Sequence, residues 1–272
     1  MTLAVVTVLA LLGWAFPYTL DYLSTETTTR RAKEAEEKID REGPAFTSRV
    51  REEEVGLDGG VVITMDRPLT PAESETLTTA DLGKEEDVRR FNKLVASHGG
   101  EKLNVPAGRT DPYTRVWLMD LFSDRAASLS IVGMRAKDLR CEPASAKTVL
   151  HFPPQGAGTY EGMWFDLSKN PYPTIADRSD KHFGKPFFSY KKIDLGNGAT
   201  PGGLRVGVTS GAKDCDWVFE VEYRDAEGTH TQQIKNGEKR FTIDGYPEHP
   251  EQTFVSFGPP DYFKDCSTDA AC

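Results

Sequence analysis

The 272-residue chain carries a formal net charge of −9 and has a pI near 5.2. Proteins that bind nucleic acid usually present a basic surface to the phosphates, so we do not expect nucleic acid as a partner. The 24 glycines and 17 prolines mark frequent turns, which favour short strands over long helices.

The first segment is the most apolar part of the chain. No charged side chain occurs from Thr2 to Leu20, and Trp14 and Tyr18 suit a membrane interface. A spanning helix needs about 20 apolar residues, a signal-peptide core needs about 7 to 15, and no small-residue cleavage site is evident here. We therefore expect residues 1–23 to form a transmembrane helix or uncleaved signal anchor that attaches the protein to a membrane.

A charged segment follows the expected anchor. Residues 24–58 contain seven basic and ten acidic side chains and few large apolar ones, so we predict a stalk over residues 24–59. The basic residues Arg30, Arg31 and Lys33 would place the following domain in the cytoplasm by the positive-inside rule. Acidic residues come first after the apolar segment, however, and the cysteines favour the other side. We therefore expect an extracytoplasmic domain of a single-pass cell-membrane protein, with a cytoplasmic domain tethered to the inner membrane face as the alternative.

The four cysteines, Cys141, Cys215, Cys266 and Cys272, lack metal-site spacing. An even count after an export-type segment predicts two disulfides, and four cysteines allow three connectivities. We favour Cys141 with Cys215, which lie in two strand candidates, and Cys266 with Cys272. Four free thiols would instead indicate the cytoplasmic alternative.

The rest of the chain predicts a mainly β fold. The strand at 215–225 (CDWVFEVEYRD) places Trp217, Phe219, Val221 and Tyr223 on one face, and many short strand patterns follow residue 112. The residues 225–228 and Asn236-Gly237 are hairpin signals between the last three of these strands. One helix is expected at 84–97, after a loop rich in proline and threonine. We predict an antiparallel β-sandwich with one short packed helix over residues 60–247, and an irregular C-terminal arm over 248–272.

The turn LHFPPQGAGTYEG at 150–162 and the strand beginning Cys215-Asp216-Trp217 carry a resemblance. Together with the apolar segment and charged stalk, they resemble uncharacterised single-pass membrane proteins of actinomycetes with an extracytoplasmic β-sandwich domain. The resemblance implies the anchor and the location of the domain. It implies no activity, cofactor or site residue.

No motif supports catalysis or a cofactor. The sequence contains no P-loop, no dinucleotide fingerprint, no nucleophile elbow and no zinc-protease helix, and its five histidines are scattered. We therefore assign no catalytic residue, metal site or cofactor, and favour a non-catalytic domain over an enzyme.

Aromatic side chains between the predicted strands are the main functional candidates. Exposed rings on loops can stack on sugars or fill pockets in partner proteins. We therefore predict ligand binding by Tyr160, Trp164 and Tyr172. The expected function is a binding or scaffolding module of the cell envelope, with a cell-wall polymer or envelope protein as partner. The alternative is a carbohydrate-binding or carbohydrate-active domain, with Asp166 as a nearby acid.

Overall fold

The computed structural model describes residues 43–53, 60–105, 113–125, 127–153, 162–196, 198, 202–257 and 263–267. The chain divides into two units, Met1–Ala45 and Phe46–Cys272, and the second unit holds all the described strands and helices. The predicted anchor and the predicted stalk up to residue 42 lie outside the described residues. Within the described ranges, no helix is long and apolar enough to cross a membrane.

The fold is mainly β, as predicted, and the residues that the structure describes form three five-stranded sheets and two short α-helices. We name each sheet after a central strand. The β4 sheet contains, in spatial order, β1 (Thr47–Glu52), β4 (Arg115–Phe122), β10 (Gly202–Thr209), β7 (Met163–Asp166) and β8 (Thr174–Ile175). Its pairs are antiparallel except for β10 with β7, which are parallel.

The β11 sheet is built on the two longest strands of the described chain. Its order is β12 (Gly228–Ile234), β11 (Lys213–Asp225), β5 (Leu129–Pro143) and β9 (Ile193–Leu195), and β13 (Phe241–Ile243) also pairs with β11. The four residues of β11 that were predicted to face the core, Trp217, Phe219, Val221 and Tyr223, are all buried, and Val218 and Glu220 between them are buried as well. The turn from Asp225 to Gly228 joins β11 to β12, as its residues predict.

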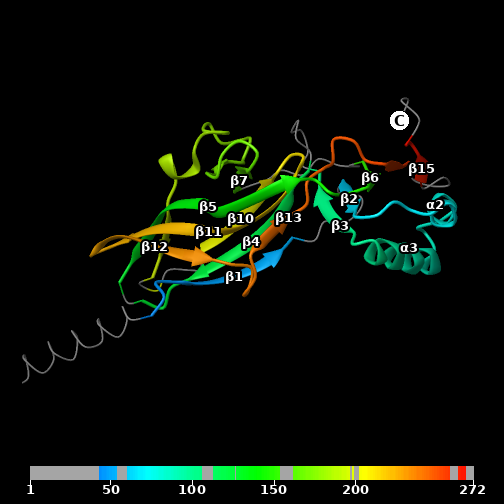
Figure 1. The fold of residues 1–272 in the computed structure, drawn as a ribbon. Coiled ribbons are helices and arrows are strands. Elements are labelled where there is room, and N and C mark those ends of the chain that lie inside the picture. Colours follow the sequence, from blue (N-terminus) through cyan, green and yellow to red (C-terminus); the bar gives the residue numbers. More distant parts are fainter. Residues whose placement is uncertain are drawn as a thin grey trace, which may run out of the picture. The chain divides into compact units, whose positions relative to one another are not determined.

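The β4 and β11 sheets, which lie side by side in Figure 1, meet through aromatic side chains. Trp117 of β4 contacts Trp217 of β11, with ring centroids 5.7 Å apart, and contacts Phe241 at 5.3 Å. Further along the interface, Phe165 of β7 lies 5.0 Å from Phe219. Large rings of this kind bury much apolar area, so they supply much of the stabilisation between the two sheets.

The β6 sheet carries both helices. Its order is β15 (Phe263–Asp265), β14 (Gln252–Ser256), β6 (Thr148–Phe152), β2 (Val61–Met65) and β3 (Glu101–Asn104). Helices α2 (Pro71–Thr78) and α3 (Glu85–Ser97) contribute Leu77, Phe91 and Val95 to one apolar cluster with β2, β6, β14 and β15. Figure 1 shows both helices beside these strands.

Four local predictions need correction. A single short helix was expected, but the loop rich in proline and threonine forms α2, because Thr70 and Glu73 make a capping box and Pro71 occupies the first turn. Strand β1 lies within the predicted stalk, where its exposed residues gave no apolar pattern. The predicted irregular arm contains β14 and β15. The Asn236-Gly237 turn forms, yet β12 and β13 both pair with β11 and not with each other.

The expectation of an entirely antiparallel fold is also wrong for two strand pairs. Besides β10 with β7, β14 pairs with β6 in parallel. Parallel neighbours require a long connection, and the chain supplies one each time, from Asp166 to Gly202 and from Phe152 to Gln252. Strand periodicity reports which face is buried, and it does not report the direction of the neighbouring strand.

The predicted disulfide between Cys141 and Cys215 is present and joins directly opposed residues of β5 and β11. Its sequence separation is 74 residues. No described cysteine is free. The other predicted bridge includes Cys272, which lies outside the described residues.

We predict that replacing Cys141 and Cys215 together by serine lowers the free energy of unfolding by about 4 kcal/mol, because a loop of this length restricts the unfolded chain. For a domain of this size the melting temperature should fall by about 10 °C, measured by differential scanning calorimetry under non-reducing conditions. The parent protein and the double variant measured again after reduction are the control, and they should melt close together because neither then has the Cys141–Cys215 bridge. A double variant that melts within about 2 °C of the parent would contradict the expectation, because this shift corresponds to a loss of less than about 1 kcal/mol.

Candidate functional site

A groove runs along the outer face of the β11 sheet, beside the segment that connects β7 to β9 and includes β8. Its volume is about 750 Å³. The floor comes from β5 and β11, through Gly133, Arg135, Glu220 and Glu222, and the wall comes from the connecting segment. In Figure 1 this segment, in yellow-green, loops out next to β5.

Local hydrogen bonds hold the wall of the groove in place. The Ala136 amide donates to the Pro171 carbonyl at 2.9 Å, and the Phe187 amide donates to the Pro173 carbonyl at 2.9 Å. Phe187 opens the short 3₁₀ helix η2 (Phe187–Ser189), and its side chain is buried. The Asn170 side chain accepts a hydrogen bond from the Tyr172 amide at 2.9 Å. The wall is therefore positioned before any ligand arrives, which limits the entropy lost on binding.

Tyr172 is the aromatic residue that the groove presents to solvent. Its side chain is 54 % exposed, although large apolar rings are normally covered. Arg135 lies next to it, and the pKa of Arg135 is raised by hydrogen bonding to Glu220 and then by its interaction with the Tyr172 phenol. Phe188 also lines this part of the groove. An exposed ring beside polar side chains can stack on a ligand while its neighbours form hydrogen bonds.

The floor of the groove carries a compensated charge network. Glu220 is buried, accepts a hydrogen bond from Arg135 Nε at 2.8 Å, and also binds Lys137 Nζ. Hydrogen bonds from Lys137 and from Arg135 keep the pKa of the Glu220 carboxyl below its usual range, despite its burial. Glu222, two residues further along β11, is exposed in the groove and can accept hydrogen bonds from a ligand.

The structure places the predicted ligand-binding residues in different environments. Tyr172 lines the groove. Trp164 of β7 is only 4 % exposed, and its ring covers Gly207 of β10, where an added Cβ would lie 3.1 Å from Trp164 Cε3. Tyr160 lies outside the described residues. The carboxylate of Asp166 is already bonded to its sequence neighbours. It binds Lys169 Nζ at 2.7 Å and accepts a hydrogen bond from the Ser168 hydroxyl.

Sequence reasoning missed Arg135 as a groove residue. Its strand was predicted, and its alternation with buried Met134 and Ala136 was available as a signal that Arg135 faces outward. The sequence did not indicate that the segment around Tyr172 would lie over this face.

A second cluster lies near the start of β4 and the ends of β6 and β13. Tyr113 and Tyr246 stack with ring centroids 4.2 Å apart, and His151 Nε2 lies 3.1 Å from the Tyr246 hydroxyl. Burial lowers the pKa of His151 and raises the pKa of Tyr246, so both are neutral near pH 7. No three His, Cys, Asp or Glu side chains of the described chain come together in a way that would hold a metal ion.

Asp244, just after β13, is the most strongly perturbed carboxyl group near this cluster. Burial raises its pKa to about 6, with smaller contributions from the carboxylates of Glu101, Asp214 and Asp66, and Arg115 opposes the rise. A carboxyl group that resists ionisation can belong to an acid–base site or can be a local cost of folding. No described nucleophile lies beside it with the geometry of a catalytic pair, so we assign it no catalytic role.

Comparison of the chain with protein-family models, with curated proteins and with solved structures finds no match.

The raised pKa of Asp244 predicts a pH dependence of stability. Because the folded pKa of about 6 exceeds the unfolded value near 3.8, the folded state binds more protons between these pH values, and stability is lost as the pH rises through them. Asp244→Asn should stabilise the protein by about 1–2 kcal/mol at pH 8, a value discounted for partial exposure, and much less at pH 4. Urea denaturation at both pH values measures this difference.

Asp124→Asn, which removes an exposed carboxylate, is the matched control and should change stability little at either pH. An equal effect of Asp244→Asn at pH 4 and pH 8 would show that Asp244 does not ionise as we expect.

Proposed function

We propose that this protein is an extracytoplasmic binding module of the cell envelope, built on a β-sandwich and attached to the membrane by residues 1–23 and the charged segment that follows. The groove at Tyr172 is its ligand site. The observation that carries the proposal is the exposed Tyr172 ring beside Arg135 and Glu222, on a wall fixed by backbone hydrogen bonds.

The disulfide between Cys141 and Cys215 supports the location that we propose. Disulfides persist in oxidising environments and are rare where thioredoxin and glutathione keep thiols reduced. The net charge of −9 would repel a dense polyanion, so it favours a ligand that is neutral or carries few negative charges.

Carbohydrate is the ligand class that the groove supports best. Sugar rings present an apolar face that packs on a tyrosine and hydroxyl groups that pair with guanidinium, amide and carboxylate groups. Arg135, Asn170, Glu222 and Thr231 place such groups along the groove. An envelope protein that inserts a peptide into the groove is the competing ligand.

The location is tested by the oxidation state of the cysteines. We expect protein that is alkylated during extraction from its native membrane, without reductant, to yield a peptide pair linked through Cys141 and Cys215 in mass spectrometry. The membrane should retain the protein after washing with high salt and alkaline carbonate, because an apolar helix holds it. Recovery of four alkylated cysteines would instead favour the cytoplasmic, membrane-tethered alternative.

The binding function is tested with full-length protein in detergent and a panel of neutral and acidic oligosaccharides. Tyr172→Ala should weaken binding of the best ligand about tenfold, because loss of a stacked ring at a binding site costs roughly 1–2 kcal/mol. Isothermal titration calorimetry measures the affinity.

Phe257→Ala is the matched control, since Phe257 is a large exposed ring, at 63 %, that does not line the groove. Binding unaffected by Tyr172→Ala would disprove the assignment of the site. A pull-down from envelope extracts that recovers one protein through Tyr172, with no oligosaccharide bound, would replace carbohydrate by a peptide ligand.

A further inference from the structure

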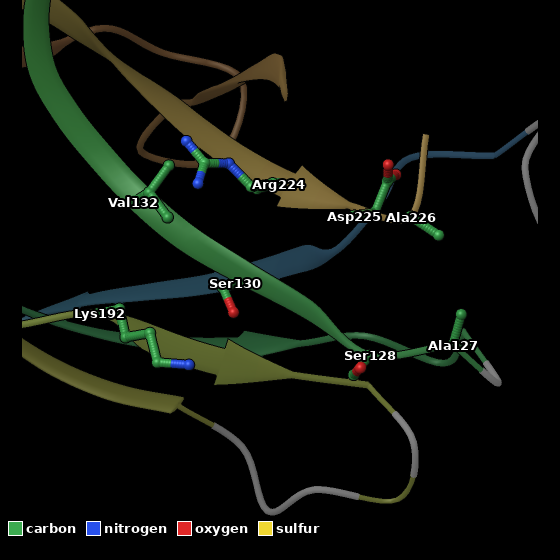
Figure 2. A pocket seen from close by; sticks show the side chains of 8 residues that line it. All are labelled: Ala127, Ser128, Ser130, Val132, Lys192, Arg224, Asp225 and Ala226. Carbon is green, nitrogen blue, oxygen red and sulfur yellow. The ribbon is translucent and has the colours of Figure 1, made fainter. Parts of the chain in front are cut away.

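A second pocket continues the Tyr172 groove toward the start of β5, near Leu129. Its volume is about 630 Å³, and it shares Val132 with the groove. Figure 2 shows the side chains that line it. They include Ser130 of β5, Ser128 just before β5, Lys192 just before β9, and Arg224 of β11. The two cavities therefore form neighbouring parts of one surface on the outer face of the β11 sheet.

Arg224 gives this pocket an uncompensated positive charge. Its side chain is exposed, and its guanidinium has no ion-pair or hydrogen-bond partner among the described residues. In Figure 2 the guanidinium extends from β11 toward the side chain of Val132 on β5. Arginine presents a fork of donors that matches carboxylate and phosphate groups, so an unpaired guanidinium in a pocket favours an anionic ligand.

Lys192 supplies a second cation that a ligand can recruit. Its ammonium group lies 3.0 Å from Asp194, in a pair whose side chains are 62 % and 57 % exposed. Ion pairs this exposed contribute little, so exchange of Asp194 for a ligand anion costs little. The Ser130 hydroxyl lies on the same side, where it donates to Asp194 at 2.5 Å.

The acidic lining residue Asp225 is already neutralised by its neighbours. Its carboxylate lies 3.3 Å from Arg125 Nη1 and 3.2 Å from His230 Nε2. It also accepts a hydrogen bond from the Glu227 amide at 2.9 Å. Repulsion of a ligand anion by Asp225 is therefore reduced.

We propose that this pocket binds the acidic group, carboxylate or phosphate, of a glycan whose neutral part occupies the Tyr172 groove. The inference rests on the proposed function and adds the chemical class of the ligand. Along β5, Ser130 and Arg135 are five residues apart, so the surface spans about 17 Å, enough for more than one sugar ring.

Glu222 limits how the charges of the ligand are spaced. It lies opposite Gly133, two residues before Arg224 on β11, so its carboxylate faces the surface between the two cavities. A carboxylate there accepts sugar hydroxyls and repels a second acid. The ligand therefore alternates acidic and neutral units and is not uniformly charged.

The test compares four probes with full-length protein by isothermal titration calorimetry. They are an oligosaccharide that alternates glucuronate with N-acetylglucosamine, a glycerol-phosphate oligomer that carries neutral sugars, a neutral N-acetylglucosamine oligomer, and a uniformly charged galacturonate oligomer. We expect one of the first two to bind at least tenfold more tightly than the last two. Preference between these first two identifies carboxylate or phosphate as the acidic group.

Arg224→Ala should weaken the preferred acidic probe about tenfold and leave the neutral probe unchanged, while Arg224→Lys retains part of the affinity. The salt dependence of binding should also become shallower in Arg224→Ala, because one fewer charge pair forms on binding. Lys93→Ala, which removes the same charge from the exposed face of α3, is the control and should change neither. Unchanged melting temperatures exclude misfolding of the variants.

The outcomes separate the inference from the proposed function. Glycan binding that needs Tyr172 but responds equally to Arg224→Ala with neutral and acidic probes, or not at all, overturns the anionic pocket and leaves the proposed function standing. Tightest binding of the uniformly charged oligomer overturns the alternating pattern. Failure of every probe to bind overturns the anionic pocket together with carbohydrate as the ligand class, and it leaves the peptide ligand to be tested by the pull-down.

Discussion

The long antiparallel pairing of β5 with β11 is the interaction on which the rest of the domain depends. Its register runs from Lys213 opposite Pro143 to Arg224 opposite Ser130, with two irregularities between. A slip by one residue would exchange the buried and exposed faces of a strand, so the register sets which side chains enter the core. The disulfide joins opposed residues within this register and restricts alternatives to it. The same pairing places the aromatic core on one face and the proposed ligand surface on the other.

Sequence reasoning succeeded where a local pattern determines a local structure. The alternation of Trp217, Phe219, Val221 and Tyr223 identifies β11 because apolar area must be buried on one face of a strand. The apolar stripe of α3 depends on its own residues in the same way. Failures occurred where the outcome depends on distant partners. The parallel neighbours of β7 and β14 are of this kind, since nothing within a four- or five-residue strand specifies the direction of the next one.

The candidate site was predictable only in part, for a physical reason that Trp164 and Tyr172 illustrate. Both are large aromatic residues in a region rich in turns, and their sequence signals are alike. Trp164 is covered because it packs against Gly207 on the neighbouring strand, and Tyr172 is exposed because the carbonyl of Pro171 holds its segment at the edge of β5. Exposure of a ring is therefore a tertiary property. The cations Arg135 and Arg224 were visible as outward positions of strands, but their common surface appears only once β5 and β11 are paired.

The order of the β6 sheet also has a consequence for biosynthesis. Strand β6 lies between β2, which precedes it, and β14, which follows it by about a hundred residues. Until β14 has left the ribosome, β6 has an open hydrogen-bonding edge, and Phe152 lacks the cover that residues of β14 and β15 provide. Open edges next to apolar clusters invite aggregation in partly made chains. Strands that are synthesised much later thus cover β6, and a nascent chain exposes this edge and its apolar cluster until they arrive.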